Sequence, residues 1–287
     1  MVAARDCGHG FRDGRTAHGD DHASGGLRPR NPRRMSAERN RGVLVTGASG
    51  GIGRAIAQRF AADGERVAVH YASREEEGEA TLASLEGGEH VLVHGDIADP
   101  AAAESVVAAA VEGLGGLDVL VNNAAAVIPH PLPETSYADW QATWRRIIGV
   151  NVFGAANLSY CAARHMIERG TPGRIVNVGS RGAYRGEPDM PAYGASKAAL
   201  HSLGQSLAVS LGPYGIGVAS VAPGFTLTER VQHRLEGSAG EAVSGQSPFG
   251  RVAAPEEIAS AAAYLAAPEA VWTSGAVLDV NGASHLR

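Results

Sequence analysis

The sequence has almost no cysteine and no long apolar run. Cys7 and Cys161 are the only cysteines, and no metal-binding spacing of ligand residues surrounds them. This composition excludes a disulfide framework and predicts no metal site. No apolar run approaches the roughly 20 residues that cross a bilayer, and the N-terminus lacks the apolar core of a secretory signal. We therefore expect a cytoplasmic protein without a membrane partner.

An excess of basic residues is also missing. The chain has 25 Lys and Arg against 30 Asp and Glu, which gives a formal net charge of -5. Because nucleic-acid-binding proteins normally present a basic surface, nucleic acid is not the expected partner. The 287 residues, 44% of them hydrophobic, suffice for one α/β domain with a sizeable core. This composition favours a small molecule as the partner.

The first 41 residues differ in composition from the rest of the chain. They are rich in Arg, Gly, Asp and His and contain almost no periodic apolar residues. Such a segment cannot offset the entropy of ordering, so residues 1–41 are predicted to form a disordered N-terminal tail. Arg33 and Arg34 leave a twin-arginine export signal and a nucleic-acid-binding arm as alternatives, although the following MSAERNRG is polar. Met35 is an alternative start of translation.

From residue 42 onward, short β-branched runs alternate with Ala-rich segments of helical length. We expect strands at residues 43–45, 66–71, 90–94, 119–121, 174–178, 216–221 and 276–280. We expect helices at residues 54–62, 75–85, 101–112, 137–169, 192–211 and 255–266. The near-continuous apolar strands indicate burial on both faces, as in a parallel sheet. Residues 42–287 are therefore predicted to form a single domain: a doubly wound, Rossmann-type α/β fold of about seven strands with helices on both faces.

A glycine-rich segment, TGASGGIG at residues 46–53, follows the first expected strand and leads into a helix. Glycines permit a sharp turn and a close approach of the backbone to a pyrophosphate, which the helix N-terminus attracts. A plain turn is the alternative, but the strand before the segment and the helix after it favour phosphate binding. The predicted dinucleotide contacts in this segment are Gly47, Ser49, Gly50, Gly51, Ile52 and Gly53.

The end of the second expected strand, HYASREEE, bears on the choice of cofactor. An acidic residue there would hydrogen-bond the 2′-hydroxyl of NAD(H) and repel the 2′-phosphate of NADP(H). Tyr71 occupies that position, and Ser73 and Arg74 follow within reach of a phosphate. These residues are predicted cofactor contacts and favour NADP(H) over NAD(H). The alternative is that Arg74 only opens a solvated helix.

Tyr193 and Lys197 stand four positions apart in a segment that is expected to be helical, so both side chains share one helix face. A neighbouring ammonium lowers the pKa of a phenol by favouring the phenolate, which suits the pair to proton transfer. Alone, this spacing is common on helix surfaces. Ser180 adds weight, because it follows the strand at 174–178 at a carboxyl edge, where α/β enzymes bind ligands. A hydroxyl there can steady a substrate oxygen.

Taken in order, these motifs resemble those of the classical short-chain dehydrogenases/reductases, including 3-oxoacyl-reductase-like members. The matching pieces are TGASGGIG at 46–53, GDIAD at 95–99, NNAA at 122–125, Asn151 in GVNVFG, Ser180 in IVNVGS, YGASK at 193–197 and APGFTLT at 222–228. The resemblance spans residues 42–284. Three positions depart from the pattern: Ala125 replaces a frequent Gly, Gly50 stands where many NADPH-dependent members carry Arg, and Asn281 in LDVNGA replaces a common Asp.

The resemblance implies an NAD(P)-dependent oxidoreductase that interconverts a ketone or aldehyde with an alcohol by hydride transfer. It implies that Tyr193 is the general acid and base, and that Ser180 hydrogen-bonds the substrate oxygen. Lys197 would lower the pKa of Tyr193 and hold the nicotinamide ribose, while Asn151 would support a water-linked proton relay. Further implied cofactor contacts are Asp96, Ile97, Asn123, Ala124, Ala125, Pro223, Gly224, Thr226 and Thr228. The alternatives are a catalytically silent dinucleotide-binding sensor and a lyase or epimerase on the same scaffold.

The polar segment at residues 226–251 lies where the family places a substrate-covering lid. His233 and Arg234 are candidate substrate contacts there, with solvated loop residues as the alternative. Arg181, Tyr184 and Arg185 would favour an anionic or carrier-bound acyl substrate, unless they lie at the surface or in a subunit contact. Thioesters, polyketide-like ketones, sugars, steroids and simple alcohols all stay open as substrates. By analogy with several family members, we expect a homotetramer or homodimer.

Overall fold

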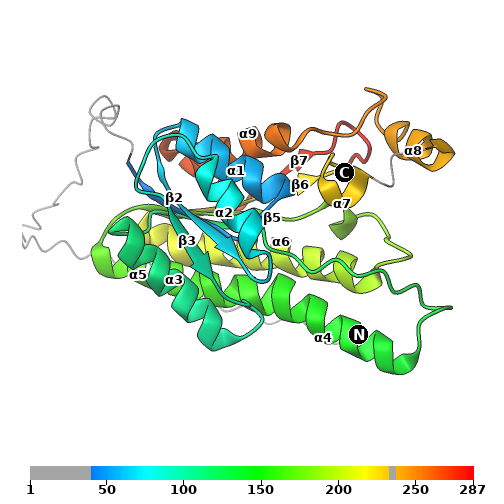
Figure 1. Cartoon of the computed structure of the whole chain (residues 1–287), viewed down its shortest axis with the longest axis horizontal. Coiled ribbons are helices and arrows are strands. Elements are labelled where there is room, and N and C mark those ends of the chain that lie inside the picture. Colours follow the sequence, from blue (N-terminus) through cyan, green and yellow to red (C-terminus); the bar gives the residue numbers. More distant parts are fainter. Residues whose placement is uncertain (1–39, 233–236) are drawn as a thin grey trace, which may run out of the picture. The chain divides into compact units, whose positions relative to one another are not determined.

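A computed structural model describes residues 40–232 and 237–287. Within these ranges, one sheet of seven parallel strands has the order β3-β2-β1-β4-β5-β6-β7 (Figure 1). The strands are β1 (Gly42–Val45), β2 (Arg66–Tyr71), β3 (Val91–His94), β4 (Val119–Asn122), β5 (Gly173–Val178), β6 (Ile216–Pro223) and β7 (Val277–Val280). The predicted Rossmann-type sheet is thereby confirmed, and each strand lies within two residues of its expected bounds.

The central strands are buried along their length because helices cover both of their faces. Every residue of β1, β4, β5 and β6 is buried. In the register of the sheet, Leu44 of β1 lies between Ala68 of β2 and Leu120 of β4. Alternate β1 residues therefore serve two separate cores: Val43 and Val45 contribute to one, and Leu44 contributes to the other.

The helices form one layer on each face of the sheet (Figure 1). The first layer contains α1 (Gly51–Ala62), α2 (Glu75–Ala83) and α9 (Pro255–Ala266), and Ile56, Phe60 and Ile258 fill its core. The second layer contains α3 (Pro100–Leu114), α5 (Ala155–Arg169) and α6 (Pro191–Leu211), with α4 (Tyr137–Ile148) packed beside α6. Helices on both faces were predicted from the apolar character of the strands.

The helix expected over residues 137–169 is not continuous. A π-helical segment, η2 (Gly149–Gly154), separates α4 from α5. Two long-range contacts account for this wider turn. The side chain of Asn151 hydrogen-bonds the backbone of Ala126, and a Cβ on Gly154 would stand 2.8 Å from Ile97. Local sequence does not reveal contacts of this kind, whereas π-helical segments are frequent at functional sites.

The ordered fold begins before residue 42. Arg41, assigned to the tail from composition, donates hydrogen bonds to the carboxylate of Glu65 and to the carbonyl of Ala266. The side chain of Glu65 is 1% exposed, so Arg41 supplies the partner that a buried carboxylate needs. Residues 1–39 of the predicted tail, with Arg33, Arg34 and Met35, lie outside the described residues.

The strand order creates a crevice at the carboxyl edge of the sheet. From β1 the chain proceeds outward through β2 and β3, and then returns to place β4 on the other side of β1. Loops leave neighbouring strands in opposite directions at such a point, which is where open α/β sheets bind ligands. Short elements border this edge: η3 (Arg181–Ala183), α7 (Glu229–Gln232) and α8 (Gly237–Ser244). No helix within 40–232 and 237–287 is long and apolar enough to cross a bilayer.

Candidate active site

A cavity of about 580 Å³ opens at the carboxyl edge. It brings together residues that were selected from seven separate segments of the sequence. The predicted site residues on its wall are Gly47, Ser49, Gly50, Gly51, Ile52, Gly53, Ser73, Arg74, Asp96, Ile97, Asn123, Ala124, Ala125, Ser180, Tyr193, Lys197, Pro223, Gly224, Thr226 and Thr228. Tyr71 and Asn151 do not line the cavity.

The glycine-rich turn leaves bare backbone at the start of α1. Gly47 has a φ of 63° and Gly51 a φ of 53°, a conformation that residues with a Cβ rarely adopt. Gly53 has a different reason to be glycine, since a Cβ there would stand 2.3 Å from the carbonyl oxygen of Gly47 and 2.5 Å from Nδ2 of Asn123. The turn, α1 and the loop after β4 are therefore in backbone contact, with the helix N-terminus facing the cavity.

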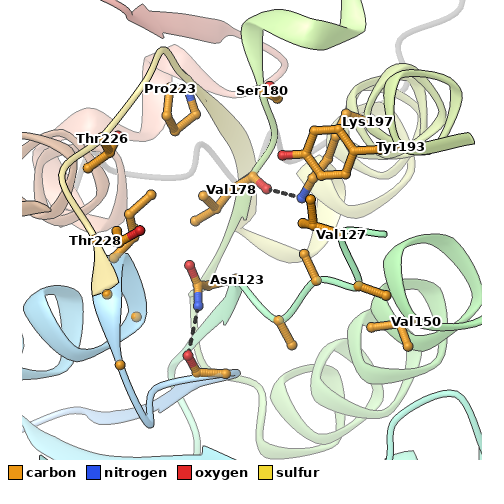
Figure 2. A pocket seen from close by; sticks show the side chains of 18 of the residues that line it. Asn123, Val127, Val150, Val178, Ser180, Tyr193, Lys197, Pro223, Thr226 and Thr228 are labelled. Atoms are coloured by element: carbon orange, nitrogen blue, oxygen red, sulfur yellow. Dashed lines mark hydrogen bonds between the residues drawn. The ribbon is translucent and has the colours of Figure 1, made fainter. Parts of the chain in front are cut away.

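Thr46 and Asn123 hold the ends of β1 and β4 together. The Oγ1 atom of Thr46 accepts hydrogen bonds from the backbone N–H groups of Asn123 and Ala124, at 2.9 and 3.0 Å. Nδ2 of Asn123 donates to the carbonyl oxygens of Thr46 and Gly47, at 2.8 and 3.1 Å, and Figure 2 shows this nitrogen directed at one carbonyl oxygen. Thr46 is fully buried and had no assigned role in the sequence analysis, although it opens the glycine-rich motif.

His70 joins the glycine-rich turn to the loop after β3. The backbone N–H of Gly47 donates to Nδ1 of His70, and Nε2 lies 2.9 Å from the carbonyl oxygen of Gly95. Nδ1 must be unprotonated to accept the N–H of Gly47, and the carbonyl of Gly95 can only accept. These two bonds together require a neutral ring with its proton on Nε2. Burial lowers the pKa of His70, against the opposing effect of the Gly95 hydrogen bond. Sequence analysis placed His70 inside a strand and gave it no role.

At one end of the cavity, Arg74 takes the place that a side chain on Gly50 would occupy. A Cβ on Gly50 would stand 3.4 and 3.7 Å from the guanidinium nitrogens of Arg74, and 3.7 Å from Oε2 of Glu229. The other carboxylate oxygen of Glu229 accepts from Arg54 at 3.2 Å. Tyr71, in contrast, turns its hydroxyl to Glu75 at 2.8 Å, and so the described geometry gives its predicted cofactor contact no support.

Asp96 and Ile97 border the same end of the cavity. Partial burial works against ionisation of Asp96, but the hydrogen bonds from Arg146 at 2.6 Å and from the N–H of Ala98 outweigh it and hold the pKa of Asp96 below its ordinary value. Asp96 is therefore a carboxylate with an oriented side chain. Ile97 is 3% exposed and supplies an apolar surface beside it.

The other end of the cavity contains the proposed proton-transfer pair. Tyr193 and Lys197 lie one turn apart near the start of α6, and the Nζ atom of Lys197 is 5.6 Å from the centre of the Tyr193 ring. Nζ also donates to the carbonyl oxygen of Val178 at 2.8 Å, which ties α6 to the end of β5. Figure 2 shows the Tyr193 hydroxyl pointing into the cavity, toward Val178 at the end of β5 and the segment after it that carries Ser180.

Ser180 directly follows β5, where the chain turns into η3. Its backbone is extended, and its Oγ atom accepts a hydrogen bond from the N–H of Gly182 at 2.9 Å. Since that bond uses the oxygen as an acceptor, the hydroxyl proton can still be donated to a ligand oxygen in the cavity. The expected juxtaposition of a strand-end hydroxyl with Tyr193 is thus present.

Asn151 lies behind this pair rather than on the cavity wall. It is 1% exposed, and its Nδ2 atom donates to the Oγ of Ser196 at 2.9 Å. Ser196 in turn donates to the carbonyl oxygen of Tyr193. Asn151 therefore connects the π-helical segment η2 to the backbone of the Tyr193 turn.

The loop after β6 closes the remaining side of the cavity. Pro223 ends β6, and Gly224 follows it. Beyond them, the N–H of Leu227 donates to the carbonyl of Ala253 at 2.8 Å. Thr228 then lies against Gly51, because a Cβ on that glycine would stand 3.0 Å from its methyl group. His233 and Arg234, the candidate substrate contacts of this segment, lie outside the described residues.

Comparison with known proteins supports the same conclusion as the geometry. The family described as Enoyl-(Acyl carrier protein) reductase matches residues 47–285. The L-rhamnose 1-dehydrogenase (NAD(P)(+)) of Sphingomonas sp. (strain SKA58) is 38% identical over 247 residues, covering 85% of this chain and 96% of the relative. The 3beta-hydroxysteroid dehydrogenase 1 of Eggerthella lenta is 35% identical over 247 residues, covering 85% of this chain and 93% of that relative. A crystal structure of a proposed 2-deoxy-d-gluconate 3-dehydrogenase from Agrobacterium tumefaciens with bound NADP has a TM-score of 0.76 at 31% identity, covering 87% and 97%.

The chain is a short-chain dehydrogenase/reductase. The family resemblance, the fold and the class of enzyme expected from the motifs are thereby confirmed. This short-chain dehydrogenase/reductase is an NAD(P)-dependent enzyme that acts on CH–OH groups.

Arg181 and Arg185 were selected in this dehydrogenase/reductase as candidate contacts for an anionic substrate. Arg181 is 5% exposed and donates to Oγ of Ser284 at 2.5 Å and to Oε1 of Gln246 at 2.6 Å. Its guanidinium also covers the ring of Phe225, and Arg185 donates to the same Oε1 of Gln246. Both side chains are thus directed at neighbouring segments of their own chain.

We expect Gly53→Ala to weaken dinucleotide binding by about 10-fold or more and to lower the free energy of unfolding by about 1–3 kcal/mol, since the new methyl group overlaps Gly47 and Asn123. Titration of NADPH and NADH by protein fluorescence, with thermal denaturation, measures both effects. The matched control is Gly88→Ala, which meets nothing within 4 Å. Equal affinity in the two variants would contradict the close contact.

We also expect the free energy of unfolding to decrease as the solution becomes more acidic, and part of this decrease to come from His70. Its pKa is lowered from 6.5 in the folded protein, so below about pH 6.5 the unfolded ring binds a proton that the folded ring resists. The free energy of unfolding therefore decreases as the pH falls, and dinucleotide affinity decreases with it because a protonated Nδ1 opposes the N–H of Gly47. Urea denaturation between pH 8 and 5 should show a shallower dependence in His70→Gln, and identical slopes would exclude the His70 contribution.

Proposed function

We propose that this enzyme interconverts a ketone or aldehyde with an alcohol, that Tyr193 moves the proton, and that NADP(H) is preferred over NAD(H). One observation carries this proposal: Tyr193, Lys197 and Ser180 share a single cavity with the glycine-rich turn at residues 47–53. The chemical groups for proton transfer and the backbone for a pyrophosphate thus face the same space. A sensor without catalytic function would not require this arrangement.

The residues around the turn fit a nicotinamide dinucleotide. Gly47, Gly51 and Gly53 keep side chains out of the space at the N-terminus of α1, where an anion is stabilised. Asp96 offers an ionised acceptor, and Ile97 offers an apolar surface for an aromatic base. When bound, the nicotinamide supplies or accepts the hydride.

The remaining chemistry belongs to side chains of this enzyme. The Tyr193 hydroxyl donates its proton to the carbonyl oxygen of the substrate in reduction and takes up the alcohol proton in oxidation. The Ser180 hydroxyl donates a hydrogen bond that orients the same oxygen. The Lys197 ammonium, held by the Val178 carbonyl, stabilises negative charge on the phenol oxygen. Asn151 positions the Tyr193 turn through Ser196 and provides the amide of the expected proton relay.

The preference for NADP(H) is supported by the position of Arg74. Its guanidinium lies beside Gly50 at the cavity wall and has no acidic hydrogen-bond partner among residues 40–232 and 237–287. Glu229 opposes this preference by its negative charge, but Arg54 pairs with it at 3.2 Å. The name of the Sphingomonas relative includes both cofactors, and the Agrobacterium protein was solved with NADP. A net positive charge is thus available for a 2′-phosphate.

Self-association into a homodimer or homotetramer is part of this proposal. Large apolar side chains are exposed on α6, on η6 (Pro268–Thr273) and on the edge strand β7, including Val209, Trp272 and Leu278. Trp272 is 96% exposed, and an edge strand such as β7 has unpaired backbone groups that a second chain can cover.

Tyr193→Phe should reduce kcat by about 100-fold or more, because only the proton-transferring hydroxyl is lost. Cofactor affinity should stay within about 3-fold of the unmodified enzyme. The measurement follows the ultraviolet absorbance of the reduced nicotinamide with a panel of ketones and alcohols. Tyr160→Phe is the control, since Tyr160 is 67% exposed on α5 and outside the cavity. Full activity in Tyr193→Phe would refute the assignment of the proton-transfer residue.

Arg74→Ala should weaken NADPH binding by about 10-fold or more and NADH binding by less than about 3-fold, because a charge-assisted contact to the 2′-phosphate is lost. Calorimetric titration with each cofactor measures the two affinities. Arg59→Ala is the matched control, because Arg59 pairs with Asp63 on α1 and does not line the cavity. An equal loss for both cofactors would remove the argument for a phosphate contact.

A further inference from the structure

Glu187 is the acidic side chain at the end of the cavity that contains Tyr193 and Ser180. It lies half-buried on the cavity wall, in the segment between η3 and α6. A Cβ on Gly182 would stand 2.7 Å from Oε1 of Glu187 and 3.2 Å from Oγ of Ser180. The Glu187 carboxylate and the Ser180 hydroxyl therefore lie next to the same point of the backbone.

Gly182 makes room for this carboxylate, because a Cβ there would overlap it. On the other side, a Cβ on Gly194 would stand in ordinary contact with the stem of Glu187, at 3.8 Å. Gly194 directly follows Tyr193 in α6. Glu187 is thus packed between the turn that carries Ser180 and the turn that carries Tyr193, with the cavity before it.

No hydrogen bond or ion pair satisfies the Glu187 carboxylate within the described ranges 40–232 and 237–287. The nearest positive charges belong to Arg181 and Arg185, whose hydrogen bonds go to Gln246 and Ser284. Burial raises the pKa of Glu187, while these two charges act against the rise. The Glu187 carboxylate is only half-buried and faces the cavity, so a ligand hydroxyl that enters the cavity can donate to it in place of water.

We propose that Glu187 determines substrate class by accepting hydrogen bonds from hydroxyl groups adjacent to the reacting carbon. The substrate is then an uncharged polyhydroxylated compound, a sugar or a cyclic polyol, oxidised or formed at the carbon beside Tyr193. This inference rests on the function proposed above and deepens it. The negative charge of Glu187 would repel an anionic acyl group. A hydroxyl group, in contrast, can donate a hydrogen bond to the carboxylate.

The cavity wall also offers apolar surface for a small ring. Val127, Pro129, Met190, Phe225 and Val231 line the cavity together with Glu187. Such side chains can contact the carbon atoms of a ring, while Ser180, Tyr193 and Glu187 supply donor and acceptor groups. Arg181, the residue that would recognise an anion, covers Phe225 and donates to Gln246 and Ser284.

The test compares substrates that differ only in their hydroxyl groups. Aldopyranoses and cyclohexane-1,2-diol are assayed with NADP⁺ and NAD⁺ beside their hydroxyl-poor counterparts, 2-hydroxytetrahydropyran and cyclohexanol. Acetoacetyl thioester reduction is assayed with NADPH and NADH. We expect kcat/KM for at least one hydroxyl-rich compound to exceed that of its counterpart by about 10-fold or more. Glu187→Gln should raise the KM for that hydroxyl-rich compound by about 10- to 100-fold, with kcat within about 3-fold of the unmodified enzyme.

Two controls separate recognition from structure. Glu187→Gln should turn over the hydroxyl-poor compounds within about 3-fold of the unmodified enzyme and should bind NADPH normally, because the lost charge contacts only the added hydroxyl groups. Glu134→Gln makes the same change at an exposed carboxylate that does not line the cavity, and it should leave both substrate classes unchanged.

The outcomes that would overturn the inference are distinct from failure of the proposed function. Faster turnover of the thioester or of hydroxyl-poor compounds, or an equal effect of Glu187→Gln on all substrates, would refute the role of Glu187 and leave the oxidoreductase function standing. A preference for 2-aminocyclohexanol over the diol would show that the carboxylate pairs with an ammonium and would refute the hydroxyl assignment. Turnover of none of these compounds would refute the proposed function, and the inference with it.

Discussion

The mutual hydrogen bonding of Thr46 and Asn123 joins the ends of β1 and β4 at the point where the sheet changes direction. Both side chains bond backbone groups of the opposite strand end, so the glycine-rich turn is held directly against the loop after β4 that forms the floor of the cavity. The next strand outward, β5, carries the carbonyl that holds Lys197 and leads into Ser180. The distance between the phosphate-binding backbone and the proton-transfer groups is therefore set by the spacing of three neighbouring strands.

Much of this arrangement could be predicted from the sequence, because its causes are local. Buried parallel strands are mostly apolar, and α9 begins with Pro255 at a position where proline fits a helix start, so both kinds of element have clear signals. The motif residues that line the cavity were selected because most of them stand after a strand or in the first turns of a helix. These are the places where backbone geometry requires a particular residue type.

The features that escaped prediction have causes far away in the chain. The π-helical break at η2 depends on Ala126 and Ile97, and the role of His70 depends on Gly47 and Gly95. Tyr71 was selected by position alone, but its hydroxyl finds Glu75 in the first turn of α2. The arginines that follow Ser180 were candidate substrate contacts, with a surface or subunit contact as the alternative, while the fold provides them with Gln246 and Ser284. Hydrogen-bond partners brought together only by folding decide each of these cases.

The ion pair between Arg54 and Glu229 has a consequence for how ligands reach the cavity. It connects α7, on one border of the cavity, to α1 on the other, with side chains that are 32% and 61% exposed. Pairs so open to water contribute about 1 kcal/mol or less and are weakened further by dissolved salt. The ion pair therefore supplies little of the free energy that holds this border of the cavity closed, and dissolved salt lowers that contribution further.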